Sequence, residues 1–289
     1  MATALLSLPW THREPLVGTP YTLWGHSRSA ERASFYLPEL NLQLDSGLAL
    51  PKDPRVVLVT HGHTDHSCAL STNFIGWQPK ESVFFDLVVP EDQKEVTADY
   101  LLAARRMFKA NASRGMRPIK IYGAKPGDSF VFDSKVPVEV RTFECDHSIS
   151  CLGYGLVEVR NKLKKEHLGK EGKELVRLKD AGEEITYREE HPHLAYLGDT
   201  SMRVFLNHPE ILTYSTILME CTFLLPEDQV EARRKKHIHW LFLKPLIKGH
   251  PKCTFYLTHF SMKYTAEVIK DFFEKEGNKL PNVHIWVDT

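Results

Sequence analysis

The sequence predicts a mixed α/β fold, a sandwich of two β-sheets with helices on the outside. Short runs rich in apolar and β-branched residues recur along the chain, and the clearest is Arg55–Val59. Such runs are typical of buried strands. Several of them end directly before histidine or acidic residues, as at 60–66, 144–148 and 259–261. Because side chains that act together must meet, we expect these strand ends to lie along one edge of the two sheets.

The predicted elements follow from the same patterns. Strands are expected at 21–24, 34–44, 55–60, 83–89, 119–122, 136–143, 153–159, 194–197, 216–220, 253–258 and 283–287. Helices are expected at 67–75, 90–109, 171–179, 226–236 and 266–276. We expect one domain over 1–289, with an insertion at 161–192.

The insertion is defined by its composition. Residues 160–179 include eight basic and three acidic residues, and acidic residues then cluster from Asp180 to Glu190. Low apolar content with high charge is typical of an exposed excursion rather than of a core.

The composition of the whole chain excludes few functions. The 289 residues contain 42% hydrophobic residues, enough for a core, and 37 basic residues balance 37 acidic ones. A nucleic-acid partner would therefore need local basic patches. Five cysteines without a CxxC pair indicate a reducing compartment. The sequence has no apolar run of membrane length and no signal-peptide pattern, so we expect no membrane partner. We expect a cytoplasmic location, and a nuclear or organellar location stays open.

The densest motif is Thr-His-Gly-His-Thr-Asp-His at 60–66. His61 and His63 are two residues apart, so they point the same way in extended backbone. Asp65 and His66 follow as the chain turns. Imidazoles and carboxylates bind zinc and similar divalent ions, and four such groups on one loop suit two metal centres better than one.

Further candidate ligands follow in a set order. They are His147, Gly198-Asp199-Thr200 and His259. Together with the first motif, they resemble the ligand set of the metallo-β-lactamase fold. Three more motifs narrow the resemblance to tRNase Z, the endonuclease family that removes 3′ trailers from tRNA precursors. They are Glu220-Cys221-Thr222-Phe223, His237-Ile238-His239 and Thr258-His259-Phe260-Ser261.

The resemblance covers the chain from about residue 20 to its end. It implies a four-layer αββα sandwich with an inserted basic arm, and two zinc ions per subunit. In the family's pattern, one zinc would be held by His61, His63 and His147. The other would be held by Asp65, His66 and His259, with Asp199 as the bridge.

The same resemblance implies roles in catalysis. His237 would be the general acid for the leaving ribose oxygen, and Glu220 would keep it charged and oriented. His239, two residues on, is the competing candidate. Asp65 is a candidate for proton transfer from the attacking water.

The family's tRNA-binding arm lies between the third histidine ligand and the bridging aspartate, where the basic segment stands here. Its candidate phosphate contacts are Lys162, Lys164, Lys165, Lys170 and Lys173. Further substrate-binding candidates are Thr200, His239 and Lys263. The resemblance also implies a homodimer in which the arm of one subunit holds tRNA for the other.

A second basic segment has no acidic residue between Tyr100 and Gly127. Its basic residues are Arg105, Arg106, Lys109, Arg114, Arg117, Lys120 and Lys125. We interpret it as a surface for a polyanionic substrate beside the metal site, and the alternative is a solvated helix face with a basic loop.

The sequence therefore predicts a zinc-dependent endoribonuclease that removes 3′ trailers from precursor tRNA, leaving a 3′-hydroxyl on the tRNA and a 5′-phosphate on the trailer. Two alternatives stay open. One is a metallo-β-lactamase-fold phosphodiesterase or thioester hydrolase for another substrate. The other is an RNA-binding protein on an inactive fold, although the complete set of candidate ligands argues against inactivity.

Overall fold

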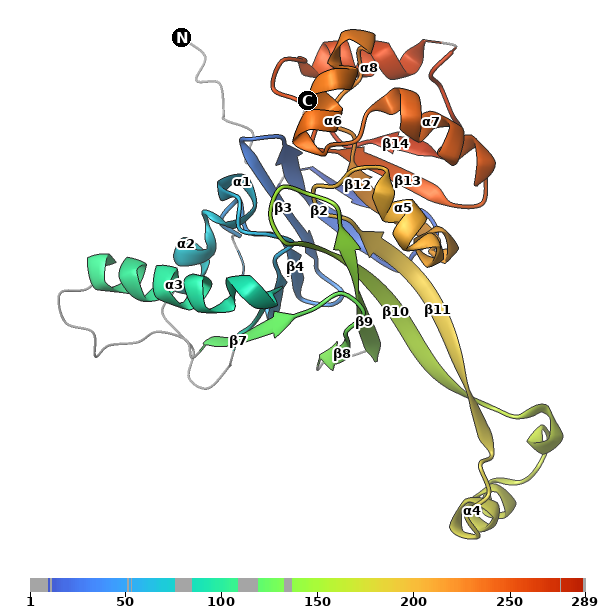
Figure 1. The fold of residues 1–289 in the computed structure, drawn as a ribbon. Helices are drawn as coiled ribbons and strands as arrows, with labels where there is room; N and C mark the ends of the chain where they lie inside the picture. Colours follow the sequence, from blue (N-terminus) through green and yellow to red (C-terminus); the bar gives the residue numbers. More distant parts are fainter. Residues whose placement is uncertain are drawn as a thin grey trace, which may run out of the picture.

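The structure is a computed structural model that describes residues 10, 12–50, 52, 54–75, 85–108, 119–132, 137–275 and 277–287. Within these ranges two seven-stranded sheets pack face to face (Figure 1). Helices pack on the outer face of each sheet, through separate apolar clusters. The predicted four-layer αββα sandwich is confirmed.

The first sheet has its strands in sequence order, antiparallel from β1 to β4 and parallel from β4 to β7. The strands are β1 Arg13–Pro15, β2 Thr22–Arg28, β3 Arg32–Leu37, β4 Leu42–Leu44, β5 Val56–Leu58, β6 Phe85–Pro90 and β7 Ile119–Ala124.

The second sheet repeats this plan, antiparallel from β8 to β11 and parallel from β11 to β14. The strands are β8 Ser129–Phe132, β9 Val138–Cys145, β10 Cys151–Leu163, β11 Thr186–Tyr196, β12 Thr216–Glu220, β13 Thr254–Thr258 and β14 Val283–Ile285.

Helices flank both sheets. On the first sheet they are α1 Thr64–Ser67, α2 Leu70–Ile75 and α3 Lys94–Phe108. After β11 they are α5 Arg203–Asn207, α6 Gln229–Lys235, α7 Trp240–Gly249 and α8 Ala266–Glu274. The remaining helix, α4 Gly172–Asp180, lies between β10 and β11. No helix in the described ranges has the length and apolarity needed to cross a membrane.

The central parallel strands explain the unbroken apolar runs. Val56 and Leu58 of β5 lie in the core between the sheets, whereas Val57 packs in the cluster that includes Leu70 of α2 and Leu101 of α3. A strand covered on both faces needs apolar residues at every position. Packing on both faces fixes the position of β5, so the motif at 60–66 that follows it is held at the edge of the sheet.

The insertion is a projecting ribbon with α4 at its tip, called the arm below (residues 158–191; Figure 1). The strand expected to end at 159 continues to Leu163 as β10. The strand expected to begin at 194 starts at Thr186 as β11. Opposite charges face each other across this ladder, as in the Lys162–Glu189 ion pair at 2.8 Å. Such cross-strand pairs support strands that bury little apolar area.

Several elements differ from expectation. The expected strand 34–44 is two strands, β3 and β4, because a turn follows Pro38 in which Asn41 has a φ of 49°. Of the expected helix 67–75, the structure has α2 over Leu70–Ile75, and the separate short helix α1 ends at Ser67. Among the α-helices and strands of the described ranges, four have no counterpart in the sequence prediction: β1, β8, α5 and α7.

The basic segment between Tyr100 and Gly127 is only partly described. Lys109, Arg114 and Arg117 lie outside the described residues. Arg106 is exposed on α3, and Lys125 lines a cleft that His147 also lines. Its role as a substrate surface stays a prediction.

Candidate metal centre

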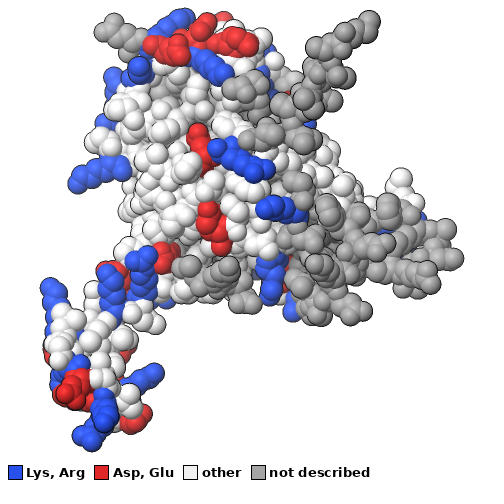
Figure 2. Space-filling model, turned by 180° about the vertical axis from the view of Figure 1, so that it is seen from behind, with Lys and Arg blue, Asp and Glu red and all other residues white. Residues whose placement is uncertain are grey.

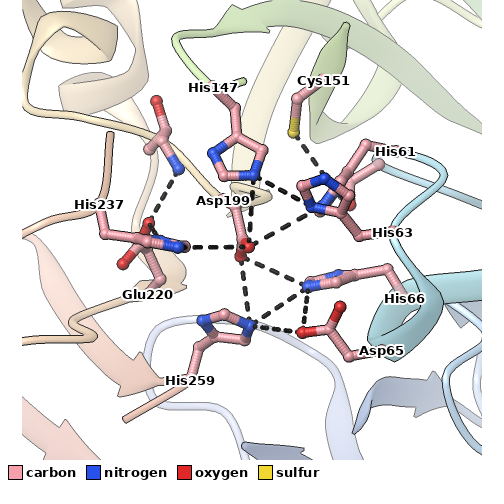
Figure 3. A network of polar contacts seen from close by, with 12 residues as sticks. His61, His63, Asp65, His66, His147, Cys151, Asp199, Glu220, His237 and His259 are labelled. Atoms are coloured by element: carbon pink, nitrogen blue, oxygen red, sulfur yellow. Dashed lines mark hydrogen bonds and ion pairs between the residues drawn. The ribbon is translucent and has the colours of Figure 1, made fainter. Parts of the chain in front are cut away.

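The candidate ligands from both sheets meet at one sheet edge (Figure 3). Those from the first sheet follow β5, on the loop and first turn of α1: His61, His63, Asp65 and His66. Those from the second sheet follow β9, β11 and β13: His147, Asp199 and His259. All of them except His63 and Asp65 are buried.

One group of donor atoms consists of three imidazoles and one carboxylate. His61 Nε2 lies 3.0 Å from His63 Nδ1, which lies 3.2 Å from His147 Nε2. Asp199 Oδ2 lies 3.8 Å from the Nε2 atoms of both His61 and His147. The four atoms therefore surround a common point.

The second group shares Asp199 through its other oxygen. His66 Nε2 lies 3.2 Å from His259 Nε2, and Asp199 Oδ1 lies 3.4 Å from each of these atoms. Asp65 Oδ2 completes the group, 3.3 Å from His259 and 3.6 Å from His66.

These separations fit bound zinc. In a tetrahedral site with bonds of about 2.0–2.1 Å, neighbouring ligand atoms lie about 3.3 Å apart. The second group spans 3.2–3.6 Å and the first 3.0–3.8 Å. Asp199 turns one oxygen to each group, so a single carboxylate can bridge two ions. The donor set therefore fits two divalent cations.

The outward ring nitrogens have partners that orient the rings. His66 Nδ1 donates to Asp45 Oδ2 at 2.8 Å. His61 Nδ1 lies 3.0 Å from Thr60 Oγ1, and His259 Nδ1 lies 3.2 Å from Thr222 Oγ1. Such contacts leave the opposite nitrogen free to bind a metal. This holds for His61, His66 and His259, whereas the buried Nδ1 of His147 has no hydrogen-bond partner within the described ranges.

Asp45 is a residue of the site that the sequence analysis missed. Besides His66, its buried carboxylate accepts hydrogen bonds from the backbone N–H of Thr60 at 2.7 Å and the hydroxyl of Tyr196 at 2.5 Å. Asp45 also has a φ of 56°, an unusual conformation for a non-glycine residue. Like the predicted ligands, Asp45 directly follows a strand, and this position is the sequence feature that could have identified it.

His237 and Glu220 form a pair beside both donor groups. Glu220 Oε1 lies 2.7 Å from His237 Nδ1, and His237 Nε2 lies 4.0 Å from Asp199 Oδ2. Burial lowers the pKa of His237, but the neighbouring Glu220 carboxylate outweighs it and raises that pKa to about 9. The ring is therefore a charged proton donor near neutral pH.

Glu220 is itself held by four further donors. It accepts the backbone N–H of Thr200 at 2.9 Å, the hydroxyl of Thr222 at 2.5 Å, and the backbone N–H groups of Thr222 and Ile238, each at 3.2 Å. Although Glu220, His237 and His259 lie close enough to hold a cation, these donors already occupy the carboxylate. The geometry favours an oriented acid over a third metal site.

Three expected substrate contacts are engaged within the protein. His239 caps α7 by accepting the N–H of Leu241 at 3.1 Å, and its other nitrogen donates to the Leu225 carbonyl at 2.8 Å. Both nitrogens of His239 therefore have partners inside the protein, and its role toward substrate stays a prediction. Thr200 is fully buried, and Lys263 pairs with Asp228 and Glu231.

The arm lysines fall into two sets. The paired set is Lys162 with Glu189, Lys164 with Glu184 and Lys170 with Glu174. Lys165 and Lys173 are exposed and make no ion pair with any residue that the structure describes. Figure 2 shows basic and acidic side chains side by side over the arm. Local pairing thus cancels much of the positive charge that the sequence suggested.

Known proteins share both sequence and fold with this chain, although no protein-family model matches it. The tRNase Z TRZ2, chloroplastic, of Arabidopsis thaliana is 26% identical over 270 residues, 90% of this chain and 73% of the relative. The tRNase Z TRZ1 of the same plant is 26% identical over 258 residues, 87% and 89% of the two chains.

Solved structures agree with this relationship. The short form of human tRNase Z superposes with a TM-score of 0.53 at 14% identity, covering 95% of this chain and 92% of that one. The metallo-β-lactamase fold protein YhfI of Bacillus subtilis gives 0.55 at 13% identity, covering 90% and 93%. Since the sequence relatives and the fold agree, the chain is a homologue of tRNase Z with the metallo-β-lactamase fold.

Proposed function

We propose that the chain is a metal-dependent endoribonuclease that removes 3′ trailers from tRNA precursors. The observation that carries the proposal is the position of His237, whose Nδ1 lies 2.7 Å from Glu220 and whose Nε2 lies 4.0 Å from the carboxylate shared by two donor groups. A ribose oxygen leaves readily only when it is protonated, whereas a thiolate leaves without a proton. The His237–Glu220 pair therefore favours a phosphodiester over a thioester, and the names of the relatives favour precursor tRNA.

The proposed cofactor is zinc, two ions per subunit. His61, His63 and His147 would hold one ion, and Asp65, His66 and His259 the other, with Asp199 between them. Bound ions of this kind supply a water of lowered pKa and neutralise the charge that develops on a phosphate.

The protein's own groups would handle the protons. His237 donates from Nε2 to the 3′-oxygen of the tRNA, while Glu220 holds Nδ1. Asp65, whose Oδ2 accepts the backbone N–H of Ala30 at 2.9 Å, is placed to take the proton of the attacking water. The products would be a tRNA with a 3′-hydroxyl and a trailer with a 5′-phosphate.

The test is cleavage of a trailer-bearing tRNA precursor by the purified protein. We expect accurate cleavage that stops when a chelator removes the metal and returns when zinc is added. An intact precursor alongside fast thioester hydrolysis would favour the alternative hydrolase. Tight tRNA binding without hydrolysis of either substrate would favour an RNA-binding protein on an inactive fold.

Replacing Asp45 by asparagine should weaken zinc binding and activity by about 10–100-fold. The amide keeps the shape of the side chain but gives His66 a weaker acceptor, so the ring loses its orientation. Zinc titration of the metal-free protein measures the affinity. Unchanged affinity for both ions would mean that Asp45 serves the fold alone.

We further propose that the arm binds tRNA and that the protein acts as a homodimer. The tip of the arm lies at the far end of the molecule from α1, which carries Asp65 and His66 (Figure 1). An arm that points away from its own metal centre is better placed to hold a tRNA for a second subunit. Mixed dimers test this: an armless subunit with an intact site, joined to a full-length subunit lacking Asp199, should recover activity.

Substituting Lys165 and Lys173 by alanine should raise the KM for precursor tRNA and lower the salt slope of binding by about 0.7–0.9 per lost phosphate contact. These two lysines have no acidic partner among the described residues, so their charge is available to phosphates. The matched control is alanine at Lys162 and Lys170, which pair with Glu189 and Glu174. A small phosphodiester should be hydrolysed normally by both variants, and an equal effect of the two pairs on tRNA would count against a role for free charge.

We propose a cytoplasmic location. All five cysteines are free, and four of them are buried, which suits a reducing compartment. Because relatives include proteins named chloroplastic and nuclear, fractionation of cells is the direct test.

A further inference from the structure

We propose that Asp146 and Lys236 are positioning residues that lock together the three segments carrying His147, Asp199 and His237. The inference rests on the proposed function only where its test measures cleavage of precursor tRNA; the measurement of zinc affinity does not depend on it. Each of the two residues directly precedes a residue of the site in the sequence, and neither belongs to the donor groups.

Asp146 makes four hydrogen bonds, and three of them join the His147 loop to the Asp199 loop. Its Oδ2 accepts the hydroxyl of Ser201 at 2.6 Å, and its carbonyl accepts the N–H of Ser201 at 3.1 Å. Its own N–H donates to Thr200 Oγ1 at 3.0 Å. The fourth bond reaches a different segment, because Oδ1 accepts from Lys236 Nζ at 2.9 Å.

Lys236 ties the end of α6 to the same loop. Its Nζ donates to the carbonyl of His147 at 3.0 Å as well as to Asp146. The residue ends α6 with a φ of 56°, a conformation that favours glycine. Glycine would satisfy the backbone conformation but has no side chain to make these two contacts. The contacts therefore explain why a lysine stands here.

His147 is a buried ligand whose ring has no orienting side chain within the described ranges. The outward nitrogens of His61, His66 and His259 each contact an orienting side chain. His147 Nδ1 is buried with no hydrogen-bond partner within the described ranges, so its ring is placed through its backbone. The bond from Lys236 to the His147 carbonyl fixes the backbone of His147. Because Lys236 directly precedes His237, the same bond also fixes the start of the segment that carries His237.

A competing role for Lys236 is contact with an RNA phosphate. Lys236, Asp146 and His147 line a cleft of about 690 Å³ beside the metal centre, and the Lys236 side chain is 45% exposed. The two roles differ in what they affect. Positioning acts on zinc affinity and turnover with every substrate, whereas a phosphate contact acts on the KM for tRNA.

The experiment compares Lys236→Gly with Lys235→Ala, a neighbouring lysine that pairs only with Glu231 among the described residues. Glycine suits the backbone at 236, so the variant should fold. We expect Lys236→Gly to weaken the binding of one of the two zinc ions by about 10–100-fold and to lower kcat for both precursor tRNA and a small phosphodiester. The KM for tRNA should stay unchanged, and Lys235→Ala should resemble the unmodified protein.

Two further variants sharpen the test. Lys236→Arg keeps the charge and the donors, so it should recover much of the zinc affinity. The double variant Asp146→Asn, Lys236→Gly should cost less zinc affinity than the sum of the two single changes, because both of them affect the Asp146–Lys236 contact. Unchanged zinc affinity in Lys236→Gly, or a rise in the KM for tRNA alone, would overturn the inference. If the unmodified protein fails to cut precursor tRNA, zinc affinity still decides this point independently.

Discussion

Replacing His237 by alanine should slow cleavage of precursor tRNA by roughly 10²–10⁴-fold while both zinc ions remain bound. The leaving 3′-oxygen is a poor leaving group unless it receives a proton. His237 is the charged imidazole beside the donor groups that belongs to neither of them. Single-turnover cleavage measures the loss, and elemental analysis measures the zinc.

A phosphodiester with a nitrophenolate leaving group is the control for this variant. Nitrophenolate leaves without a proton, so its release should be nearly unaffected by the loss of an acid. Replacing Glu220 by glutamine should give a smaller defect, since the ring stays in place but loses the carboxylate that keeps it charged. Loss of zinc from the alanine variant, or equal slowing of both substrates, would show that His237 acts as a ligand.

The sequence predicts the first half of the site because local spacing determines it. His61, His63, Asp65 and His66 lie on one loop, so an apolar strand followed by this motif is enough to bring them together. His147, Asp199 and His259 come from strands far apart in the chain, and spacing alone does not join them. Their grouping follows from the order of motifs, which the resemblance to a known family supplies.

Contacts between distant segments explain what the sequence leaves out. Asp45 reads as a turn residue, and only the packing of β4 against β11 places it between His66 and Tyr196. The sequence gives no sign that the His239 ring is engaged, because α7, whose N-terminus it caps, was not predicted. The sequence indicates a positive patch at the arm lysines, but the ribbon brings glutamates of the neighbouring strand within ion-pair distance, as with Lys162 and Glu189.

Backbone strain is a further property that residue types do not reveal. Among the described residues, five non-glycine positions have a positive φ, and four of them contact the site or belong to it: Ala30, Asp45, Lys236 and His259. Aspartate and histidine adopt this conformation more often than most residues, whereas alanine and lysine rarely do, so residue type gives little sign of it at Ala30 and Lys236. Strain of this kind persists where surrounding contacts over-determine the backbone, and it gathers at functional sites.

Replacing Asp199 by alanine should have the largest effect of any single substitution. Its two oxygens serve separate donor groups, so one change removes a ligand from both. We expect activity to fall by more than the roughly 10²–10³-fold lost with a single charge-stabilising group. Elemental analysis should find less than the full complement of two zinc ions.

A second measurement for Asp199→Ala does not depend on catalysis. A ligand that binds only the folded state raises its stability in proportion to the logarithm of its concentration over its Kd. Zinc should therefore raise the Tm of the metal-free unmodified protein clearly, and that of the variant much less. Asp180→Ala, at the end of α4 in the arm, is the matched control and should respond like the unmodified protein. If Asp199→Ala keeps two zinc ions and a full Tm response, the two donor groups are not joined by a bridging carboxylate, and the dimetal assignment fails with it.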